Sequence, residues 1–182
     1  MTDLTVNSAR VALVTGASRG IGQAIALALA EQGHLVIGTA TSSTGAQAIG
    51  EALATMPVPG KGLCLNVNEP GACEAAVAEI IKTHGRLDIL VNNAGITRDN
   101  LALRMKDDEW QDVIDTNLTA AFRLDRAVLK PMVKARWGRI IHITSVVGTS
   151  GNPGQMNYAA SKAGLGGLSR SLAREVGSRG IT

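Results

Sequence analysis

Residues Thr15 to Gly22 read T-G-A-S-R-G-I-G, a glycine-rich turn from which the rest of the sequence can be interpreted. The preceding residues, Arg10 to Val14, are nearly all apolar, as is typical of a strand covered on both faces. The apolar residues that follow recur at helical spacing, namely Ile21, Ile25, Ala28 and Leu29. Backbone N–H groups and the helix dipole at such a strand-to-helix turn attract a pyrophosphate. The glycine spacing departs from the general G-x-G-x-x-G form, and a glycine turn alone is also compatible with simple chain geometry.

Apolar runs of strand length alternate with helical segments along the remaining chain. Strands are predicted at residues 10–14, 35–40, 63–67, 87–91 and 139–144, with helices between them and a last helix over 156–176. This alternation predicts an α/β fold, a three-layer doubly wound parallel sheet of Rossmann type in order 3-2-1-4-5. We expect residues 1–182 to form a single domain, with another strand beginning near Thr182.

Composition excludes several classes of protein. Apolar residues make up 45% and charged residues 18%, which is too apolar for a disordered chain. No apolar run is long enough for a membrane span, and the polar stretch Met1 to Ser8 lacks the pattern of a signal peptide. Cys64 and Cys73 form no C-x-x-C pair and the histidines are scattered, so no metal site is expected and both thiols are expected to be buried or inert. A net charge of +3 without basic runs argues against nucleic acid, and we expect a cytoplasmic protein.

The end of the second predicted strand indicates the cofactor type. An NAD site usually carries an acid there, which binds the ribose 2′-hydroxyl. This strand ends Thr39-Ala40-Thr41, and the next acid is Glu51. The absence of a carboxylate permits a 2′-phosphate, and Arg19 supplies a nearby cation unless it is simply solvated. The pattern favours NADP over NAD.

Ser145, Tyr158 and Lys162 form the second candidate group. Tyr158 is the only tyrosine, and Lys162 follows it by four residues, so both lie on one face of a helix. A lysine ammonium ~5 Å from the phenol favours the phenolate by ~3 kcal/mol at an effective dielectric constant of ~20. A lone Y-x-x-x-K is usually a surface pair. Ser145 closes the fifth predicted strand, at the edge where parallel sheets bind ligands.

Asparagines contribute further polar groups at the same edge. The fourth predicted strand ends Asn92-Asn93-Ala94-Gly95, where glycine allows close approach of a flat ligand and the amides can fix neighbouring strands. A structural turn is the alternative for both asparagines. Asn117 lies within a helical stretch, where its side chain can hold a water or a local backbone group.

In order and spacing, T-G-A-S-R-G-I-G, N-N-A-G, Asn117, Ser145 and Y-x-x-x-K resemble the short-chain dehydrogenase/reductase family. The stretch N-N-A-G-I-T-R-D-N at Asn92 to Asn100 is similar to the bacterial 3-oxoacyl-acyl-carrier-protein reductases, as are residues 145–148 and 172–176. The resemblance covers Val11 to Thr182. It implies NADPH-dependent reduction of a 3-oxoacyl chain on an acyl carrier protein, in a cytoplasmic homotetramer of fatty acid biosynthesis.

The resemblance also implies residue roles. Ser145 would bind the carbonyl, Tyr158 would donate the proton, Lys162 would activate Tyr158, and Asn117 would hold a relay water. Cofactor contacts are implied at Gly16, Ser18, Arg19, Ile21, Thr41, Asn66, Val67, Asn93, Tyr158 and Lys162. Two alternatives stay open: reduction of acetoacetyl-CoA or another small ketone, and an inactive nucleotide-binding fragment.

Three further expectations concern surfaces. Arg136 and Arg179 are expected to flank the active-site mouth and dock an acidic carrier, unless both are merely solvated. The small residues of the last helix are expected to pack closely against a helix of the same chain or a partner subunit. Because members of the resembled family carry two more strands beyond the position of Thr182, we expect residues 1–182 alone to be a poor enzyme.

Overall fold

The computed structural model describes residues 9–182 and contains a five-stranded parallel sheet. The spatial order is β3-β2-β1-β4-β5, so the predicted order is confirmed. The strands are β1 (Val11–Val14), β2 (Leu35–Ala40), β3 (Lys61–Cys64), β4 (Ile89–Asn92) and β5 (Arg139–His142). Since all pairs are parallel, the carboxyl ends of the strands meet at one edge of the sheet, where ligands bind in such folds.

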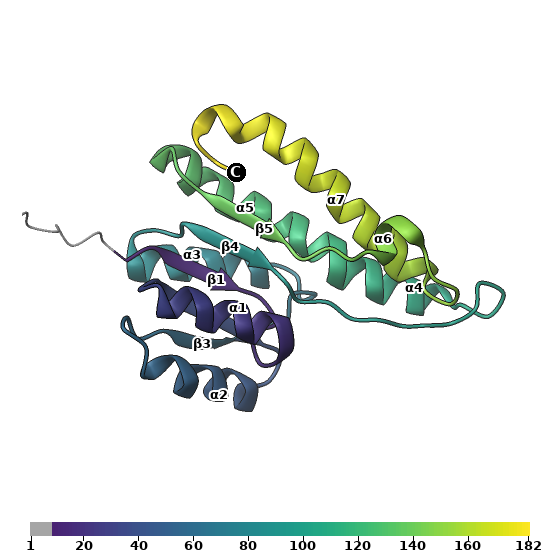
Figure 1. Ribbon diagram of the computed structural model, residues 1–182, viewed down its shortest axis with the longest axis horizontal. Helices are drawn as coiled ribbons and strands as arrows, with labels where there is room; N and C mark the ends of the chain where they lie inside the picture. Colours follow the sequence, from purple (N-terminus) through teal and green to yellow (C-terminus); the bar gives the residue numbers. More distant parts are fainter. Residues whose placement is uncertain (1–8) are drawn as a thin grey trace, which may run out of the picture.

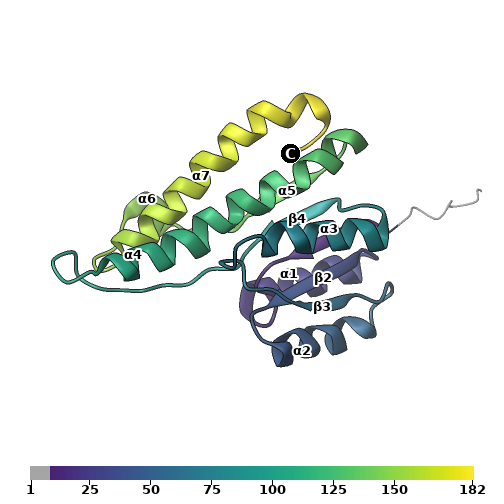
Figure 2. The same cartoon turned by 180° about the vertical axis from the view of Figure 1, so that it is seen from behind.

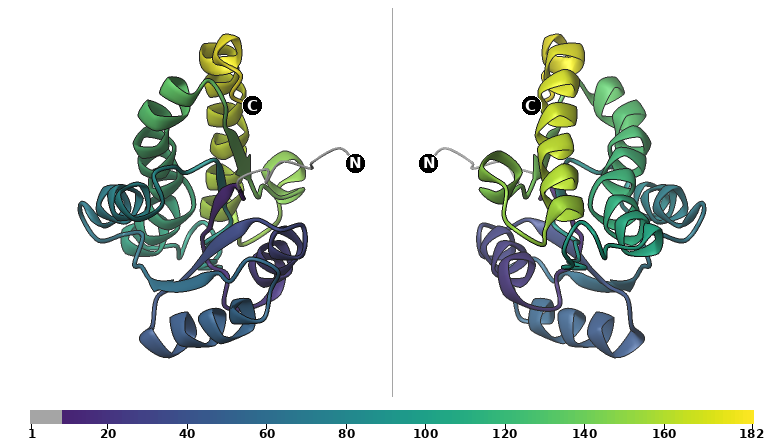
Figure 3. Two further views of the ribbon diagram at one scale, coloured as in Figure 1. Left: turned by 90° about the vertical axis from the view of Figure 1, so that its left-hand side faces the viewer. Right: turned by 90° about the vertical axis from the view of Figure 1, so that its right-hand side faces the viewer.

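Helices cover both faces of this sheet (Figures 1 to 3). One face carries α1 (Gly20–Glu31) and α2 (Ser43–Ala54), and the other carries α3 (Ala72–His84), α5 (Ala120–Ala135) and the end of α7 (Met156–Val176). A single helical run joins α4 (Asp107–Ile114), the π-helical turn η1 (Asp115–Thr119) and α5. The short helices α6 (Val147–Ser150) and η2 (Gly177–Arg179) flank α7. Figures 1 and 2 show α5 and α7 lying side by side. The three-layer α/β fold is confirmed.

Small side chains allow α1 to lie close to the sheet. Its buried residues are Gly22, Ala26 and Ala30, whereas Ile21 is 63% exposed and Ala28 is also exposed. Of the predicted apolar face, Ile25 and Leu29 pack against the core, whereas the prediction was wrong for Ile21 and Ala28. Close packing requires a small residue where this helix begins, because a Cβ at Gly22 would overlap the Gly16 carbonyl oxygen.

Some element boundaries differ from the prediction. β3 ends at Cys64 rather than Val67, although Leu65 and Val67 are buried. Burial continues past the strand because these residues line the cleft at its end, so apolar character does not mark where the sheet hydrogen bonds stop. Pro70 lies just before α3, whose N-cap is the left-handed Gly71.

Strand β5 is an edge strand of the sheet, beside β4, and is partly exposed. Ile140 packs into the cluster of α3 and α5, while Ile141, which points to the opposite face, is 43% exposed. On its outer side, Gly138 forms a parallel bridge with Ile181, and Ile140 N–H donates to Thr182 O over 2.9 Å. The expectation that a further strand begins near Thr182 is thus supported.

Within residues 9–182, no helix has the length and apolar character needed to cross a membrane, and no cluster of potential metal ligands occurs. Cys73 is buried as expected, but Cys64 is exposed. The stretch 1–8, predicted to lack a signal peptide, lies outside the described residues.

Candidate active site

The glycine turn between β1 and α1 has the geometry that its sequence predicts. Gly16 and Gly20 adopt positive φ angles of 64° and 58°. A Cβ at Gly16 would lie 3.0 Å from Ala94 Cα, and one at Gly22 would overlap the Gly16 carbonyl oxygen. The turn therefore lies directly against the end of β4, and glycine is needed there for both conformation and space.

Thr15 and Asn93 fasten this turn to β4. Thr15 Oγ1 accepts from the N–H groups of Asn93 and Ala94, both over 3.0 Å, and donates to Val91 O over 3.2 Å. Asn93 Nδ2 donates to Thr15 O over 2.9 Å and to Gly16 O over 3.0 Å. The idea that an asparagine amide fixes neighbouring strands is confirmed for Asn93. Sequence reasoning missed Thr15, for which the one available signal was a hydroxyl residue ending a buried strand.

A cleft of about 610 Å³ opens at this edge of the sheet. Eight of the ten predicted cofactor residues line it: Gly16, Ser18, Arg19, Ile21, Thr41, Asn66, Val67 and Asn93. The other two, Tyr158 and Lys162, lie beyond its lining, and Lys162 instead lines a small adjoining cavity with Asn117. The lining also includes residues that sequence reasoning missed, among them Leu65, Asn68, Arg98, Asp112 and Thr116.

The start of α1 suits a negatively charged group. Among the described residues, no side chain caps this helix, and its first turn holds no acid. Its first N–H groups therefore lack a side-chain acceptor at the point where the helix dipole is positive. Of the residues lining the cleft, Asp112 alone is acidic, and it is ion-paired with Arg98 over 3.5 Å. The cleft thus fits a dinucleotide with a further phosphate beside Arg19 and Thr41.

Tyr158 and Lys162 lie on one face of α7, as their spacing predicts. Lys162 Nζ is 5.6 Å from the centroid of the Tyr158 ring and donates to Ile143 O over 2.7 Å. Lys162 is only 6% exposed, and this burial lowers the pKa of its ammonium group. Its bond to Ile143 joins α7 to the residues just after β5.

Ser145 follows β5 by three residues and is half-buried. Its Oγ accepts from Val147 N–H over 3.2 Å. Gly148 lies against α7 so closely that a Cβ there would be 2.9 Å from Ala163 N and 3.1 Å from Lys162 Cβ. This close packing brings the segment that carries Ser145 against the helix that carries Tyr158 and Lys162.

Asn117 is 2% exposed and lies in η1, a π-helical turn of a kind often found at functional sites. Its Oδ1 accepts from Ile96 N–H over 2.8 Å, and its Nδ2 donates to Ile96 O over 2.9 Å and to Ser161 Oγ over 3.2 Å. The side-chain amide of Asn117 is thus bound to backbone groups of Ile96, which lies 21 positions away in the sequence. A Cβ at the intervening Gly95 would lie 3.2 Å from Asn117 Oδ1 and 3.7 Å from Lys162 Nζ, so the amide and the ammonium lie close together.

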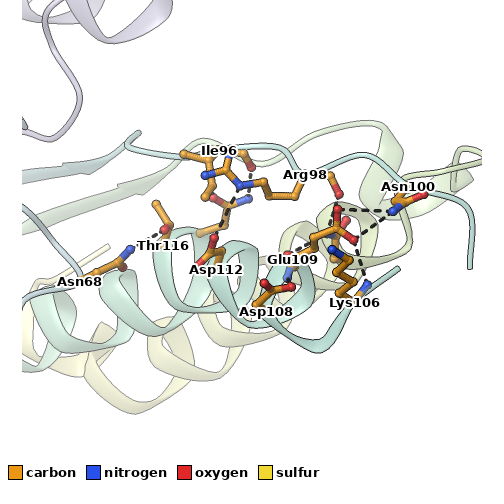
Figure 4. Close-up of polar contacts among 11 residues, drawn as sticks. Asn68, Ile96, Arg98, Asn100, Lys106, Asp108, Glu109, Asp112 and Thr116 are labelled. Atoms are coloured by element: carbon orange, nitrogen blue, oxygen red, sulfur yellow. Dashed lines mark hydrogen bonds and ion pairs between the residues drawn. The ribbon is translucent and has the colours of Figure 1, made fainter. Parts of the chain in front are cut away.

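The loop from β4 to α4 forms one wall of the cleft and is fastened by polar contacts, shown in Figure 4. Asn100 Nδ2 donates to Glu109 Oε2 over 3.0 Å, and Lys106 N–H donates to the same oxygen over 2.8 Å. The Lys106 bond, helped by Asn100, lowers the pKa of Glu109. Arg98 reaches Asp112, and Asn68 Nδ2 donates to Thr116 Oγ1 over 2.7 Å.

A buried polar trio between β4, β5 and α5 was not predicted. Asp125 Oδ1 accepts from Asn92 Nδ2 over 2.8 Å, and its Oδ2 lies 2.9 Å from His142 Nε2. The side chains of His142 and Asp125 are 3% and 4% exposed. The sequence signal for this trio was an acidic residue, Asp125, on the buried side of the amphipathic helix α5.

One expectation about surfaces needs correction, and a second is confirmed at Gly164 for packing within the chain. Arg136 precedes β5 and Arg179 follows α7, so both lie at the end of β5 opposite Ser145 and do not flank this chain's own active-site mouth. They lie near each other, because a Cβ at Gly180 would touch the Arg136 carbonyl oxygen. In α7, Gly164 packs against Leu118 of the same chain, whereas a Cβ at Gly167 would meet no described atom within 4 Å.

Comparison with known proteins identifies the family. The family model for short chain dehydrogenases matches residues 10–182. The 3-oxoacyl-[acyl-carrier-protein] reductase FabG of Escherichia coli is 63% identical over 173 residues, which span 95% of this chain and 70% of that protein. The FabG of Pseudomonas aeruginosa is 62% identical with the same coverage. A short-chain dehydrogenase from Streptomyces avermitilis superposes with a TM-score of 0.90 at 36% identity, covering 97% of this chain and 64% of that one. With the glycine turn, the cleft and the Tyr158–Lys162 pair in place, the chain belongs to the short chain dehydrogenase family.

Proposed function

We propose that this protein reduces 3-oxoacyl groups on an acyl carrier protein to 3-hydroxyacyl groups with NADPH, as a step of fatty acid biosynthesis. One observation carries the proposal: Tyr158 and the buried Lys162 share a helix face beside a cleft that fits the cofactor. The names of the FabG relatives at 57–63% identity supply the reaction and the carrier. Family membership makes the protein an oxidoreductase.

The cofactor is NADPH/NADP+. Gly16, Ser18 and Ile21, at the turn and the start of α1, would hold the pyrophosphate, while Arg19 and Thr41 would face the 2′-phosphate. Asn66 and Val67 would contact the adenine side, and Asn93 the nicotinamide side. When bound, NADPH supplies a hydride for the substrate carbonyl carbon.

Side chains of α7 and of the segment after β5 would transfer a proton to the substrate. Tyr158 Oη donates a proton to the carbonyl oxygen, which Ser145 Oγ binds through a hydrogen bond. The Lys162 ammonium group, whose Nζ is 5.6 Å from the centroid of the Tyr158 ring, would offset the negative charge that forms when the hydroxyl gives up its proton. Lys162 would also contact the nicotinamide ribose, and Asn117, whose side-chain amide is fixed to Ile96, would hold the water that returns a proton.

The substrate carrier, the assembly and the compartment are part of the same proposal. An acidic acyl carrier protein would present the thioester, and the natural enzyme would be a cytoplasmic homotetramer. Acetoacetyl-CoA and other small ketones are the competing substrates, because the described cleft holds the cofactor and does not itself select the acyl carrier.

The test is NADPH oxidation by the purified natural-length enzyme with acetoacetyl groups on carrier protein or on CoA. We expect kcat/KM to be at least tenfold higher with the carrier-bound substrate. A higher value with the CoA substrate would reassign the protein to small-ketone reduction. An absence of turnover with both substrates would favour a protein that only binds nucleotide and would contradict the proposed reaction.

A further inference from the structure

We propose that Asn157 and Ser161 are positioning residues that hold the main chain of Tyr158 from both sides and thereby place its hydroxyl. Both are 0% exposed and lie four residues apart on α7, directly beside the pair Tyr158 and Lys162. This inference rests on the proposed role of Tyr158 as proton donor. It adds two residues to the site that sequence reasoning did not single out.

Asn157 uses its whole side-chain amide. Its Oδ1 accepts from Tyr158 N–H over 2.7 Å, one of the helix-initiating N–H groups that have no partner within α7. Its Nδ2 donates to Arg98 O over 2.9 Å and to Glu109 O over 3.1 Å. A single amide thus joins Tyr158 to the loop of Figure 4 through Arg98 O and to α4 through Glu109 O. The side chain of Arg98 also lines the cleft.

Ser161 holds the other side of the same residue. Its Oγ donates to Tyr158 O over 2.8 Å and accepts from Asn117 Nδ2 over 3.2 Å. Asn117 is in turn bound to both main-chain groups of Ile96. Both polar main-chain groups of Tyr158 are therefore bonded to buried side chains, and each of those side chains is anchored in the stretch 96–117.

The arrangement fixes the rotation of α7 about its axis. Successive helical residues are ~100° apart, so the 157/161 face is buried against α4 and η1 when the 158/162 face points toward the catalytic edge. The Tyr158 hydroxyl stands at the end of a long side chain, so a small rotation at its Cα moves the oxygen much further. A misplacement of ~1 Å at a reacting group costs on the order of 10²-fold in rate.

The experiment measures Asn157→Ala and Ser161→Ala in the natural-length enzyme. We expect kcat to fall 10- to 100-fold for Asn157→Ala and less for Ser161→Ala, while the Kd for NADPH changes less than threefold. The matched control is Asn100→Ala, which removes bonds from the same loop to Glu109 and Arg104 without touching Tyr158, and which should keep kcat within about threefold.

A second measurement separates positioning from general loosening of the fold. In a Tyr158→Phe background the proton donor is already absent, so Asn157→Ala should lower the residual rate by less than twofold. An equal loss in both backgrounds, or an Asn100→Ala loss as large as that of Asn157→Ala, would overturn the positioning role. A wild-type enzyme that turns over, together with an Asn157→Ala variant of unchanged kcat, would overturn it while leaving the proposed function intact. A wild-type enzyme without turnover would instead contradict the proposed function.

Discussion

The nucleotide half of the sheet and the catalytic half are built differently. Strands β1 and β4 are buried at every residue, and the glycine turn between β1 and α1 is held by backbone geometry and by Thr15 and Asn93. Strand β5 is partly exposed, and the catalytic side chains beyond it depend on contacts with α7. The shape of the cofactor cleft is therefore set by the sheet and the glycine turn, whereas the position of the proton-transfer residues depends on how α7 is held.

This contrast implies that damage to the two halves has separable effects. Changes in the nucleotide half should act on cofactor affinity, and changes around α7 should act on the chemical step. Lys162 lies at the boundary, because its ammonium group is near Tyr158 and the cavity it lines adjoins the cleft. We expect Lys162→Ala to impair both turnover and NADPH binding.

Tyr158→Phe should give the largest separation. It removes only the hydroxyl, so kcat should fall by roughly 10²–10⁴-fold, the range of general acid–base catalysis. The Kd for NADPH, measured by nicotinamide fluorescence, should stay within about twofold of wild type. If Tyr158→Phe keeps more than about a tenth of the wild-type kcat, the assignment of Tyr158 as the proton donor is contradicted.

Gly22→Ala should do the reverse. The added methyl group would overlap the Gly16 carbonyl oxygen and meet Asn93 Nδ2, so the turn must move away from β4. We expect the Kd for NADPH to rise more than 10-fold, with kcat at saturating cofactor within about threefold of wild type. Gly167→Ala is the control, since no described atom lies within 4 Å of its Cβ. An unchanged Kd in Gly22→Ala would show that the cleft tolerates displacement of the turn.

Cofactor preference sharpens the description of the nucleotide half. The cleft lining carries Arg19 and Thr41, and its one acid, Asp112, is paired with Arg98. We expect the Kd for NADPH to be at least 10-fold below that for NADH, and Arg19→Ala to reduce this ratio several-fold. Ratios are measured by fluorescence titration at one ionic strength. Equal affinities for the two nucleotides in the wild-type protein would contradict the assignment.

Asp125→Ala probes the junction of the two halves. It leaves the buried Asn92 Nδ2 and His142 Nε2 without their observed acceptor, at a cost of about 1–3 kcal/mol. For a chain of this size we expect Tm to fall by about 2–4 °C per kcal/mol. Thermal unfolding of Asp125→Ala beside Asp112→Ala, an exposed acid, provides the comparison. A Tm equal to that of the control would show that the trio adds no stability.

The smallest effect concerns the carrier. Arg136 and Arg179 are exposed and near each other, at the far end of β5 from Ser145. If they dock an acidic carrier, reversing both charges should raise KM several-fold for carrier-bound substrate, more at low salt than at high salt, and leave KM for a CoA substrate unchanged. Equal changes for the two substrates would remove these arginines from the docking surface.

Local patterns predicted much of the fold. The bounds of β2 and α7 agree with the residues expected from apolar periodicity, and the strand order follows from the alternation of strands and helices. The predicted ends of β3 and β5 were three and two residues too late, because single hydrogen bonds to the neighbouring strands continue at Leu65 and Ile143 beyond the regular ladders. The buried face of α1 was predicted only in part: Ile25 and Leu29 pack against the core, but the fully buried positions hold the small residues Gly22, Ala26 and Ala30.

The polar framework of the site was largely beyond sequence reasoning. Thr15, Asp125 and Asn157 were all missed as site residues. The partners of Thr15 and Asn157 lie about 50 to 80 positions away along the chain, a separation that no local spacing reveals. Eight cofactor residues were placed on the cleft because their positions at strand ends and at the glycine turn are local features. The single-domain assignment and the residue roles stay predictions.

The π-helical turn η1 has a consequence for how the length of this segment can vary. It accommodates one residue more than an α-helix of the same rise, within a helical run that continues into α5. Five π-helical residues turn the chain about as far as four α-helical residues, so deleting one residue between Asp115 and Thr119 would restore the regular pitch and leave the preceding residues in nearly the same orientation toward α5. Asp112 and Glu109 would then keep their contacts with Arg98 and Asn100, and the cost would fall on the buried residues Thr116 and Asn117 within the turn. Single-residue deletions in this stretch should consequently disturb the fold less than deletions within α4 or α5, where the loss of one residue rotates one part of the helix by ~100° against the other.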